Sequence, residues 1–416
     1  MREPRRDARL LVVEPVGSSL AVLDAARELG VEVVVATFDQ GDRTLSAALR
    51  DRTDHLLRVD TNDEAALTDA VLELHAEHPV TAVVPGFEFY VDTAARLAAR
   101  LGVRGLAVDA ARRLRDKSLM RDALDAAGLR VPRYARAGNG AELEAAARLV
   151  GFPAVLKPTR SAGSVHVSRV NSLAELHAAY AWMRQDPRTD LGRGLDGRVL
   201  LEEYLAGPEV SVEGYVVDDE VVIVSVTAKE LGPEPSFVEV GHTVGTELDP
   251  EVRAAIESYV ADVCRALGVT FGPFHGELRL PDGRPVLIEM AARLAGDHIC
   301  DLIALATGTS LPRIMLASYL SLPPEQVAAA VAPAVKCAAI HFFTAPELTT
   351  LTRVEGWDSL LRSEGVLEAE LYLAPGDAVP PLEDFRGRLG HVVFTADSVA
   401  EAQQRRAVLA GAVRFE

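Results

Sequence analysis

Cysteine is scarce in this sequence. The chain of 416 residues contains three cysteines, which are widely spaced and form no CxxC pair: Cys264, Cys300 and Cys337. An odd and scattered set does not build a disulfide framework, so we expect reduced, buried thiols in a cytoplasmic protein. His298 stands close to Cys300, but no further Cys or His partner accompanies the pair, which argues against a zinc site.

Long apolar runs and an excess of positive charge are also absent. After the basic residues 1–9, only residues 10–13 are apolar before Glu14, too few for the core of a signal peptide, and no segment approaches a membrane span. The 43 basic and 61 acidic side chains give a formal charge of −18. Because such an average charge repels polyanions, we expect no nucleic acid among the partners, and we expect no membrane either.

Lysine is rare as well. Four of the 43 basic residues are lysines, namely Lys117, Lys157, Lys229 and Lys336. A chain so biased toward arginine should keep lysine mainly where a compact ammonium is needed and a forked guanidinium would not serve. Chance could also leave four lysines, so the pattern supports functional positions without establishing them.

The first hundred residues predict an α/β domain. Short apolar runs at residues 10–13, 31–36 and 81–84 alternate with helical patterns, and Ser18 or Ser19 can cap the first helix. This alternation indicates a parallel, doubly wound sheet, in which ligands bind at the carboxyl ends of strands. The corresponding loops are residues 14–19 and 85–88, although both could equally be plain turns.

The remainder of the chain predicts further domains, because 416 residues are too many for one core. Helical and extended patterns alternate up to Pro323 and Pro324, which mark a linker. Beyond them, apolar runs near residues 335–343, 366–373 and 391–395 indicate a small α+β domain.

A loop of small residues follows an apolar strand at residues 154–157. Lys157 ends the strand, and Ser161, Gly163 and Ser164 lie in the loop before a second strand begins. The tip of such a hairpin presents several backbone N–H groups that can close over phosphates while the lysine neutralises their charge. Taken alone, the motif is a weak indication of phosphate binding.

A second motif is the stretch VLLEEYLAGPEVSVE at residues 199–213. Backbone groups near Glu202, Glu203 and Leu205 could bind the adenine edge of a nucleotide. Glu209 could accept hydrogen bonds from both ribose hydroxyls. By itself, the stretch fits an ordinary strand–turn–strand better.

A third motif is a pair of glutamates, Glu277 and Glu289, in apolar segments joined by a turn at residues 281–283. On adjacent antiparallel strands the two carboxylates would lie near each other, and Mg²⁺ prefers one or two carboxylates with phosphate oxygens and water. Arg293 suits an anionic phosphate or a tetrahedral intermediate. As an isolated pair, the glutamates fit a surface salt-bridge network better.

The order of these motifs resembles the ATP-grasp superfamily. Lys117, Lys157 with its glycine loop, the EExxxGPE hinge and the two-glutamate hairpin with its arginine occur in the order and spacing typical of that fold. The segments VPGFEFYVDTAARLAARLG, FVEVGH and IEMAARLAGDHI resemble its carboxylate–amine ligase branch, including the L-amino-acid ligases that make dipeptides. The resemblance covers about residues 10–308 and extends to the C-terminal domain.

The resemblance implies a multidomain fold of α/β and α+β type with four parts. An N-terminal Rossmann-like domain would cover residues 1–108. A central domain would cover 109–206 and include an ATP lid at about 130–203. The half with the metal site would cover 207–322, and a small C-terminal α+β domain would cover 323–416.

The resemblance also implies which residues bind ATP. They are Lys117 and Lys157 at the phosphates, Ser161, Gly163 and Ser164 in the covering loop, Glu202, Glu203 and Leu205 at adenine, and Glu209 at ribose.

Five further residues receive roles in metal binding and catalysis by the same resemblance. Glu277 and Glu289 would ligate Mg²⁺, with Mn²⁺ as an alternative. Arg293 would steady the acyl phosphate and the tetrahedral intermediate. Glu239 and His242, in FVEVGH, match the part of the dipeptide ligases that meets the amino-acid substrates, and Glu239 could bind a substrate ammonium.

Two positions depart from the family pattern. Ala291 stands where many ATP-grasp enzymes have Asn, so we expect metal binding with fewer protein ligands. Asp297 stands where a bulky residue closes the acceptor pocket in such ligases. An acid at that position would favour a cationic or amino-bearing acceptor.

The resemblance therefore predicts a ligase that activates a carboxylate as an acyl phosphate and joins it to an amine such as a second amino acid, with release of ADP and phosphate. Its cofactors would be ATP and Mg²⁺, its partners small-molecule carboxylates and amines, and its assembly a homodimer. Two alternatives stay open. One is a nucleotide-binding regulatory protein on a decayed ATP-grasp fold, which the intact glutamates and lysines disfavour. The other is an ATP-grasp carboxylase, which the FVEVGH segment disfavours.

Overall fold

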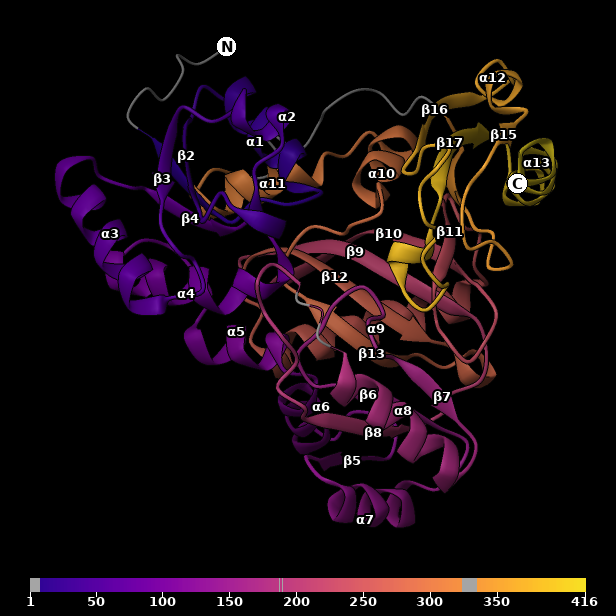
Figure 1. Cartoon of the computed structure of the whole chain (residues 1–416). Coiled ribbons are helices and arrows are strands. Elements are labelled where there is room, and N and C mark those ends of the chain that lie inside the picture. Colours follow the sequence, from indigo (N-terminus) through magenta and orange to yellow (C-terminus); the bar gives the residue numbers. More distant parts are fainter. Residues whose placement is uncertain (1–7, 187, 189, 324–334) are drawn as a thin grey trace.

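The computed structural model describes residues 8–186, 188, 190–323 and 335–416 (Figure 1). The N-terminal part, in indigo, lies beside a large central sheet, which continues into the C-terminal part, in yellow. A smaller unit, which contains the elements from β5 to β8, lies below the central sheet in this view.

The N-terminal part is a parallel sheet flanked by helices. Its strands are β1 (Arg9–Val13), β2 (Glu32–Thr37), β3 (His55–Arg58) and β4 (Ala82–Pro85), in the spatial order β3-β2-β1-β4. Its helices are α1 (Ser19–Glu28), α2 (Ala47–Arg50), α3 (Glu64–Glu77) and α4 (Val91–Leu101). Strands β1 and β4 are almost wholly buried, because helices cover both faces, which explains their continuous apolar runs. The predicted doubly wound sheet is confirmed, with β3 as an additional edge strand.

The loops after β1 and β4 contact each other directly. Ser18 occupies the N-cap position of α1 without a capping hydrogen bond from its side chain, so the prediction of a serine side-chain cap is wrong at this position. The hydroxyl of Ser19 instead donates to the carbonyl oxygen of Gly86, at 2.5 Å. A Cβ atom at Gly86 would lie 2.5 Å from the Cα atom of Pro15, so a residue with a side chain would force the loops apart.

The smaller unit has four antiparallel strands, two helices and a core of its own. Its strands are β5 (Tyr134–Ala137), β6 (Ala154–Pro158), β7 (Ser168–Val170) and β8 (Val199–Glu203), in the order β5-β8-β6-β7. The helices α7 (Gly140–Val150) and α8 (Leu173–Gln185) begin at Asn139 and Ser172, whose side chains accept hydrogen bonds from backbone N–H groups of the first turn. Leu143, Leu156 and Leu176 belong to the separate core.

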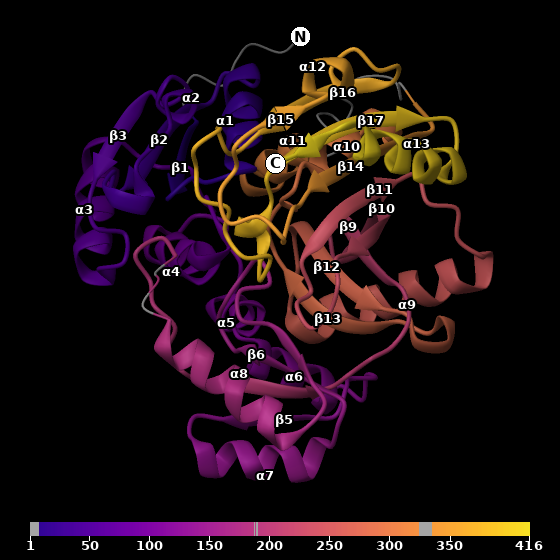
Figure 2. The same ribbon diagram turned by 45° about the vertical axis from the view of Figure 1, so that its right-hand side comes forward.

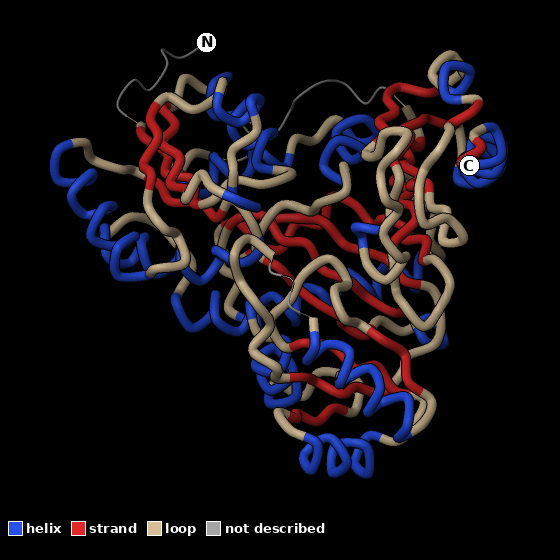
Figure 3. Tube along the Cα trace, in the orientation of Figure 1, coloured by secondary structure: helices blue, strands red, loops and turns tan. Residues whose placement is uncertain are grey.

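The central sheet is antiparallel and has the order β13-β12-β9-β10-β11-β14-β17-β16. Its strands are β9 (Glu209–Val217), β10 (Glu220–Leu231), β11 (Glu239–Val244), β12 (Gly272–Arg279), β13 (Val286–Ala291), β14 (Cys337–Phe343), β16 (Val366–Leu371) and β17 (Gly390–Ala396). In Figure 2 the C-terminal strands β14 and β17 lie above β11, which joins the two halves of the sheet. Figure 3 shows the strands of this sheet in red between helices in blue.

The other helices surround the central sheet. They are α5 (Val108–Arg115), α6 (Lys117–Ala126), α9 (Pro250–Leu267), α10 (Ile299–Thr307), α11 (Leu311–Tyr319), α12 (Trp357–Leu360) and α13 (Val399–Ala412). Helix α11 packs against both α1 and β12, so one apolar core extends from the N-terminal part to the central sheet. Two short strands, β15 (Val354–Glu355) and β18 (Arg414–Phe415), pair near the C-terminus. Among the helices that the structure describes, none is both long and apolar enough to cross a membrane.

The boundaries of the four predicted domains stay predictions. The central sheet runs across the predicted boundary at residue 323, because β11 pairs with β14 through the partners Thr243 and Ala339. Pro324, the second residue of the predicted proline linker, lies outside the described residues.

Candidate active site

A cavity of about 430 Å³ lies where all parts of the chain meet. Its wall includes Ser18 from the N-terminal part, Gly163 from the smaller unit, Glu277 from the central sheet and Phe385 from the C-terminal part. Every residue that received a role from the sequence lies in this wall: Lys117, Lys157, Ser161, Gly163, Ser164, Glu202, Glu203, Leu205, Glu209, Glu239, His242, Glu277, Glu289 and Arg293. The structure thus brings the predicted site residues together, while their individual roles stay predictions.

Lys157, near the end of β6, is buried beside Glu202 of β8. The Nζ atom of Lys157 lies 2.6 Å from Glu202 Oε2, and the Nε atom of Arg121 lies 2.6 Å from Glu202 Oε1. Burial lowers the pKa of Lys157 despite the attraction of Glu202. Burial opposes the charge of Glu202 too, but Arg121 and Lys157 lower its pKa. Glu202 therefore orients the Lys157 ammonium, a contact that its predicted adenine role did not include.

Lys117, the first residue of α6, connects the loop after β6 with the glutamate pair. Its ammonium donates to the carbonyl oxygen of Ser161, at 2.9 Å, and to Glu289 Oε1, at 2.8 Å. Asp116 caps α6 with its side chain and so fixes the point at which Lys117 leaves the backbone. A single ammonium therefore contacts both the predicted phosphate loop and a predicted metal ligand.

The predicted phosphate loop closes one side of the cavity. It follows β6, which pairs with β7 as the predicted hairpin. Gly163 and Ser164 both have positive φ angles, 64° and 60°, and the Ser164 hydroxyl donates to the carbonyl oxygen of Phe237 at 3.1 Å. A Cβ atom at Gly163 would lie 2.6 Å from the Phe385 ring, so the loop touches the C-terminal part.

The predicted hinge residues line the same cavity. Glu203 turns its carboxylate toward Arg133, whose Nε atom lies 3.1 Å away, and more than a third of both side chains is exposed. Tyr204 donates its backbone N–H to the carbonyl oxygen of Pro153, at 3.2 Å. Leu205 lines the cavity without a charged group.

Lys229 of β10 lies at the centre of three carboxylates. Its Nζ atom is 2.8 Å from Glu209 Oε1, 2.5 Å from Glu239 Oε1 and 3.1 Å from Glu277 Oε1. Burial opposes the ammonium charge, but these carboxylates raise the pKa of Lys229 well above its usual value. Arg279 also binds Glu209, with Nε 2.7 Å from Oε2. Glu209, predicted at ribose, is therefore held by two cations.

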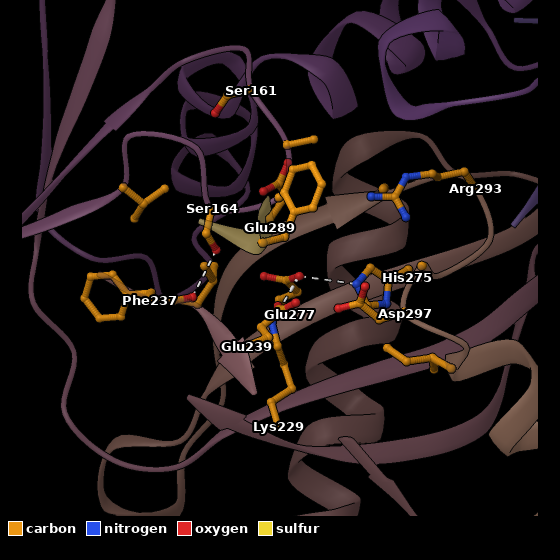
Figure 4. Close-up of a pocket in the computed structure, with 18 of the residues that line it drawn as sticks. Ser161, Ser164, Lys229, Phe237, Glu239, His275, Glu277, Glu289, Arg293 and Asp297 are labelled. Atoms are coloured by element: carbon orange, nitrogen blue, oxygen red, sulfur yellow. Dashed lines mark hydrogen bonds and ion pairs between the residues drawn. The ribbon is translucent and has the colours of Figure 1, made fainter. Parts of the chain in front are cut away.

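The glutamate pair lies on adjacent strands, as the spacing predicted. Glu277 of β12 and Glu289 of β13 are register partners, and both line the cavity (Figure 4). Burial opposes the charge of Glu277, but Lys229 and His275 hold its pKa well below the usual value. Two carboxylates on one cavity wall form a donor set that fits a hard divalent cation. Ala291 also lines the wall and supplies no side-chain ligand.

His275 contacts Glu277, one member of the glutamate pair, through its imidazole ring. Its Nδ1 atom lies 2.9 Å from Glu213 Oε1, and its Nε2 atom lies 3.3 Å from Glu277 Oε1. Burial opposes the imidazolium charge, but the hydrogen bonds to the two glutamates raise the pKa of His275 to about 9. The ring is therefore protonated at neutral pH and holds the Glu277 carboxylate in place (Figure 4).

Arg293 is fixed by a buried carboxylate from the N-terminal part. Its Nε atom lies 2.6 Å from Glu88 Oε2, and Arg115 Nη1 lies 2.8 Å from Glu88 Oε1. Burial opposes the charge of Glu88, but the two arginines lower its pKa to about 2. Glu88 lies in the 85–88 loop, which the sequence indicated as a ligand loop or a plain turn. The structure shows it as the support of a cavity arginine.

Asp297 and its two partners, His242 and Arg388, form another polar network in the cavity wall near β11. Asp297 Oδ2 lies 3.2 Å from His242 Nε2, and Asp297 Oδ1 lies 2.9 Å from Arg388 Nη1. Burial opposes the charge of Asp297, but Arg388 and His242 hold its pKa well below the usual value. Arg388 also donates from Nε to the carbonyl oxygen of Glu239, at 2.9 Å. The C-terminal part thus contributes a cation to the cavity.

Sequence reasoning assigned no role to several residues of this wall, among them Lys229, Phe385 and Arg388. The scarcity of lysine was a signal for Lys229, because Lys117, Lys157 and Lys229 all line the cavity, whereas Lys336 is exposed. No motif marked Phe385 and Arg388, which reach the cavity only through long-range packing.

Three family models match the chain in sequence order. An ATP-grasp N-terminal domain matches residues 23–104, an ATP-grasp domain matches residues 150–301, and the second C-terminal domain of L-amino acid ligases matches residues 341–416. The chain belongs to the ATP-grasp ligases. The cavity lies where the three matched segments of this ATP-grasp ligase meet, and enzymes with this fold bind ATP or ADP.

Known proteins extend the comparison beyond the family models. Alanine–anticapsin ligase of Bacillus subtilis is 26% identical over 269 residues, which are 61% of this chain and 57% of that relative. The L-arginine-specific L-amino acid ligase of Bacillus subtilis is 23% identical over 367 residues, 86% of this chain and 85% of the relative. The crystal structure of an L-amino acid ligase from Bacillus licheniformis superposes with a TM-score of 0.83 at 22% identity, covers 99% of both chains, and so shows a shared fold.

Proposed function

We propose that this ATP-grasp ligase activates the carboxylate of one amino acid with ATP and joins it to the amine of a second amino acid. The observation that carries the proposal is the charge pattern of the cavity. Three of the four lysines line it, and each contacts a glutamate of the same wall. The relatives named as ligases of alanine with anticapsin and of L-arginine support amino acids as the substrate class.

The lysines are poised to exchange partners when ATP binds. Lys117, Lys157 and Lys229 are buried and paired with carboxylates, so no bare ammonium is desolvated before ATP arrives. Phosphate oxygens can replace these carboxylates, and the loop from Ser161 to Ser164 can supply backbone N–H groups. The buried position of the lysines strengthens each contact, because the effective dielectric constant is lower there than in water.

Glu277 and Glu289 are the residues that would hold Mg²⁺ or Mn²⁺. A divalent cation bound there would neutralise charge on the transferred phosphoryl group. His275 keeps Glu277 oriented through the hydrogen bond at 3.3 Å, and Lys117 keeps Glu289 oriented at 2.8 Å. The two supports hold the carboxylates toward the cavity before the cation arrives.

The reaction proceeds by two displacements. A carboxylate oxygen of the first substrate forms a bond to the γ-phosphorus of ATP, and the bond to the ADP oxygen breaks. The amine of the second substrate then attacks the acyl carbon, and phosphate leaves with the electrons of the C–O bond. Arg293, held by Glu88, lies on the cavity wall, where it can stabilise negative charge in both steps.

The acidic part of the wall suits an amino group. Glu239 and Asp297 line the cavity, and Arg388 bridges them by contacts to the Glu239 backbone oxygen and to the Asp297 carboxylate. An ammonium that enters can share the carboxylate oxygens with Arg388. This arrangement favours an amine that carries a polar or cationic group over a purely apolar one.

The test is ADP release by the purified chain with Mg²⁺, ATP and pooled amino acids, followed by mass spectrometry of the products. We expect a product with the mass of two amino acids less one water. Glu289→Ala should abolish it, while Glu257→Ala, at a half-exposed position of α9, should not. ADP without such a product would contradict the amino-acid assignment, and ATP binding without turnover in any pool would contradict the ligase. Size-exclusion chromatography of the same sample tests the predicted homodimer.

A further inference from the structure

Three side chains from separate elements converge outside the ATP cavity. His298 precedes α10, Glu368 lies on β16, and His391 lies on β17. One ligand atom from each lies within 4.8 Å of the others. The centroids of the two imidazole rings are 4.6 Å apart. Sequence analysis argued against a zinc site at His298, because no further Cys or His accompanies His298 and Cys300 nearby in the chain. The two partners found in the structure come from β16 and β17 instead.

The second nitrogen of each ring is already held. His298 Nδ1 lies 3.1 Å from Asp301 Oδ2, and His391 Nδ1 lies 2.8 Å from the hydroxyl of Tyr372. Metal-binding histidines in proteins commonly donate their other ring N–H to a carboxylate or to another oxygen in this manner. Both rings therefore keep Nε2 for a ligand.

The Nε2 atom of His391 is buried and has no hydrogen-bond partner among the described residues. His391 as a whole is fully buried. A buried polar atom without a partner is costly, so it calls for a group that the chain itself does not provide.

We propose that His298, Glu368 and His391 bind a divalent transition-metal ion of the zinc class. Two imidazoles and one carboxylate are a common donor set for zinc, with water in the fourth position. Ligand atoms of a tetrahedral zinc ion lie about 3.3 Å apart. The three atoms must therefore approach by at most about 1.5 Å, which rotation of the exposed Glu368 side chain and the partly exposed His298 side chain can provide.

The site is separate from the glutamate pair of the ATP cavity. Its ligands are not Glu277 and Glu289, and its two nitrogens select a softer ion than Mg²⁺. A bound ion would connect the segment before α10 to the edge of the central sheet. Because Asp297 precedes His298 directly, the ion would also fix one wall of the substrate cavity.

The test is metal binding by the full chain. The protein is stripped with a chelator, given Zn²⁺ or Co²⁺, and dialysed to remove unbound ion. We expect one equivalent of Zn²⁺ by elemental analysis, and a visible absorption band of four-coordinate Co²⁺ when that ion is used. His298→Gln and Glu368→Gln should each weaken Zn²⁺ binding by about tenfold or more. His177→Gln, a half-exposed histidine of the smaller unit, is the matched control and should leave binding unchanged.

Three results would overturn the proposal: no stoichiometric zinc, equal binding by the wild type and both cluster variants, or an equal loss in the His177→Gln control. Circular dichroism and ATP binding show whether each variant is folded. Neither His298 nor Glu368 is fully buried, so both substitutions are compatible with folding. Zn²⁺ should also raise the melting temperature of the wild type more than that of either variant, which is a second readout independent of ligase activity.

Discussion

Glu88 is a sensitive point of the site, because a single buried carboxylate holds two arginines. Only 1% of its side chain is exposed, and its oxygens lie 2.8 Å from Arg115 and 2.6 Å from Arg293. Glu88→Gln keeps the size of the side chain but removes its charge. Since glutamine has one carbonyl oxygen and one NH₂ group, one of the two arginines would face a donor in place of an acceptor.

The expected loss follows from the pKa of Glu88. Its lowering from 4.5 to about 2 corresponds to about 3 kcal/mol of folding free energy at neutral pH. A lowered pKa in the folded state stabilises the protein above pH 4.5, and this contribution disappears as the pH falls through about 2. The difference between the wild type and Glu88→Gln should therefore be about 3 kcal/mol at pH 7 and about half of that at pH 3.

The assay is urea unfolding of both proteins across this pH range, followed by circular dichroism. Other carboxylates titrate in both proteins and cancel in the difference. Glu257→Gln, which removes a half-exposed ion pair with Arg253 at 3.6 Å, is the matched control and should change stability by less than about 1 kcal/mol. A difference for Glu88→Gln that is absent at pH 7, or that stays constant down to pH 3, would refute the reasoning.

Three further predictions concern the cavity. Lys229→Met leaves its three glutamate partners without their shared cation, so we expect a fall in kcat of about 100-fold in an ADP-release assay; a fall of less than threefold would contradict its role. Gly163→Ala places a Cβ atom 2.6 Å from a phenyl ring at a φ of 64°, so KM for ATP should rise about tenfold, whereas Gly194→Ala, which has open space around it, should leave KM unchanged. The raised pKa of His275 stabilises the fold fully below pH 6.5, and this contribution is lost as the pH rises through about 9. Melting temperatures should therefore fall over that range in the wild type and fall less in His275→Gln, and equal slopes would contradict the assignment.

Much of the fold was predictable because its strands are buried on both faces. The apolar runs of β1, β2 and β4 marked the parallel sheet, and the spacing of Glu277 and Glu289 placed them as partners on β12 and β13. Strand β3, with the sequence HLLR, was missed because it is an edge strand and its side chains are partly exposed. Strand β11 was missed because EVGHTV mixes charged and small residues, which pack in the sheet only when β10 and β14 flank them.

The site was predictable where it depends on local motifs. Lys117, Lys157 with its glycine loop and the glutamate pair occur in recognisable order, and all of them line one cavity. What could not be predicted depends on segments that are far apart in the chain. Arg388 meets Asp297 across 91 positions, and Glu88 meets Arg293 across 205. No periodicity or spacing encodes such contacts, because the packing of whole sheets and helices brings these side chains together.

The central claim is that the chain activates a carboxylate by phosphoryl transfer from ATP. The most direct measurement uses an amino-acid substrate with ¹⁸O in its carboxylate and follows the label during turnover with ATP. Because the bond between the acyl carbon and the bridging oxygen breaks when the amine attacks, one ¹⁸O atom should appear in each phosphate released, together with ADP. Phosphate without ¹⁸O, or AMP and pyrophosphate in place of ADP and phosphate, would contradict the account.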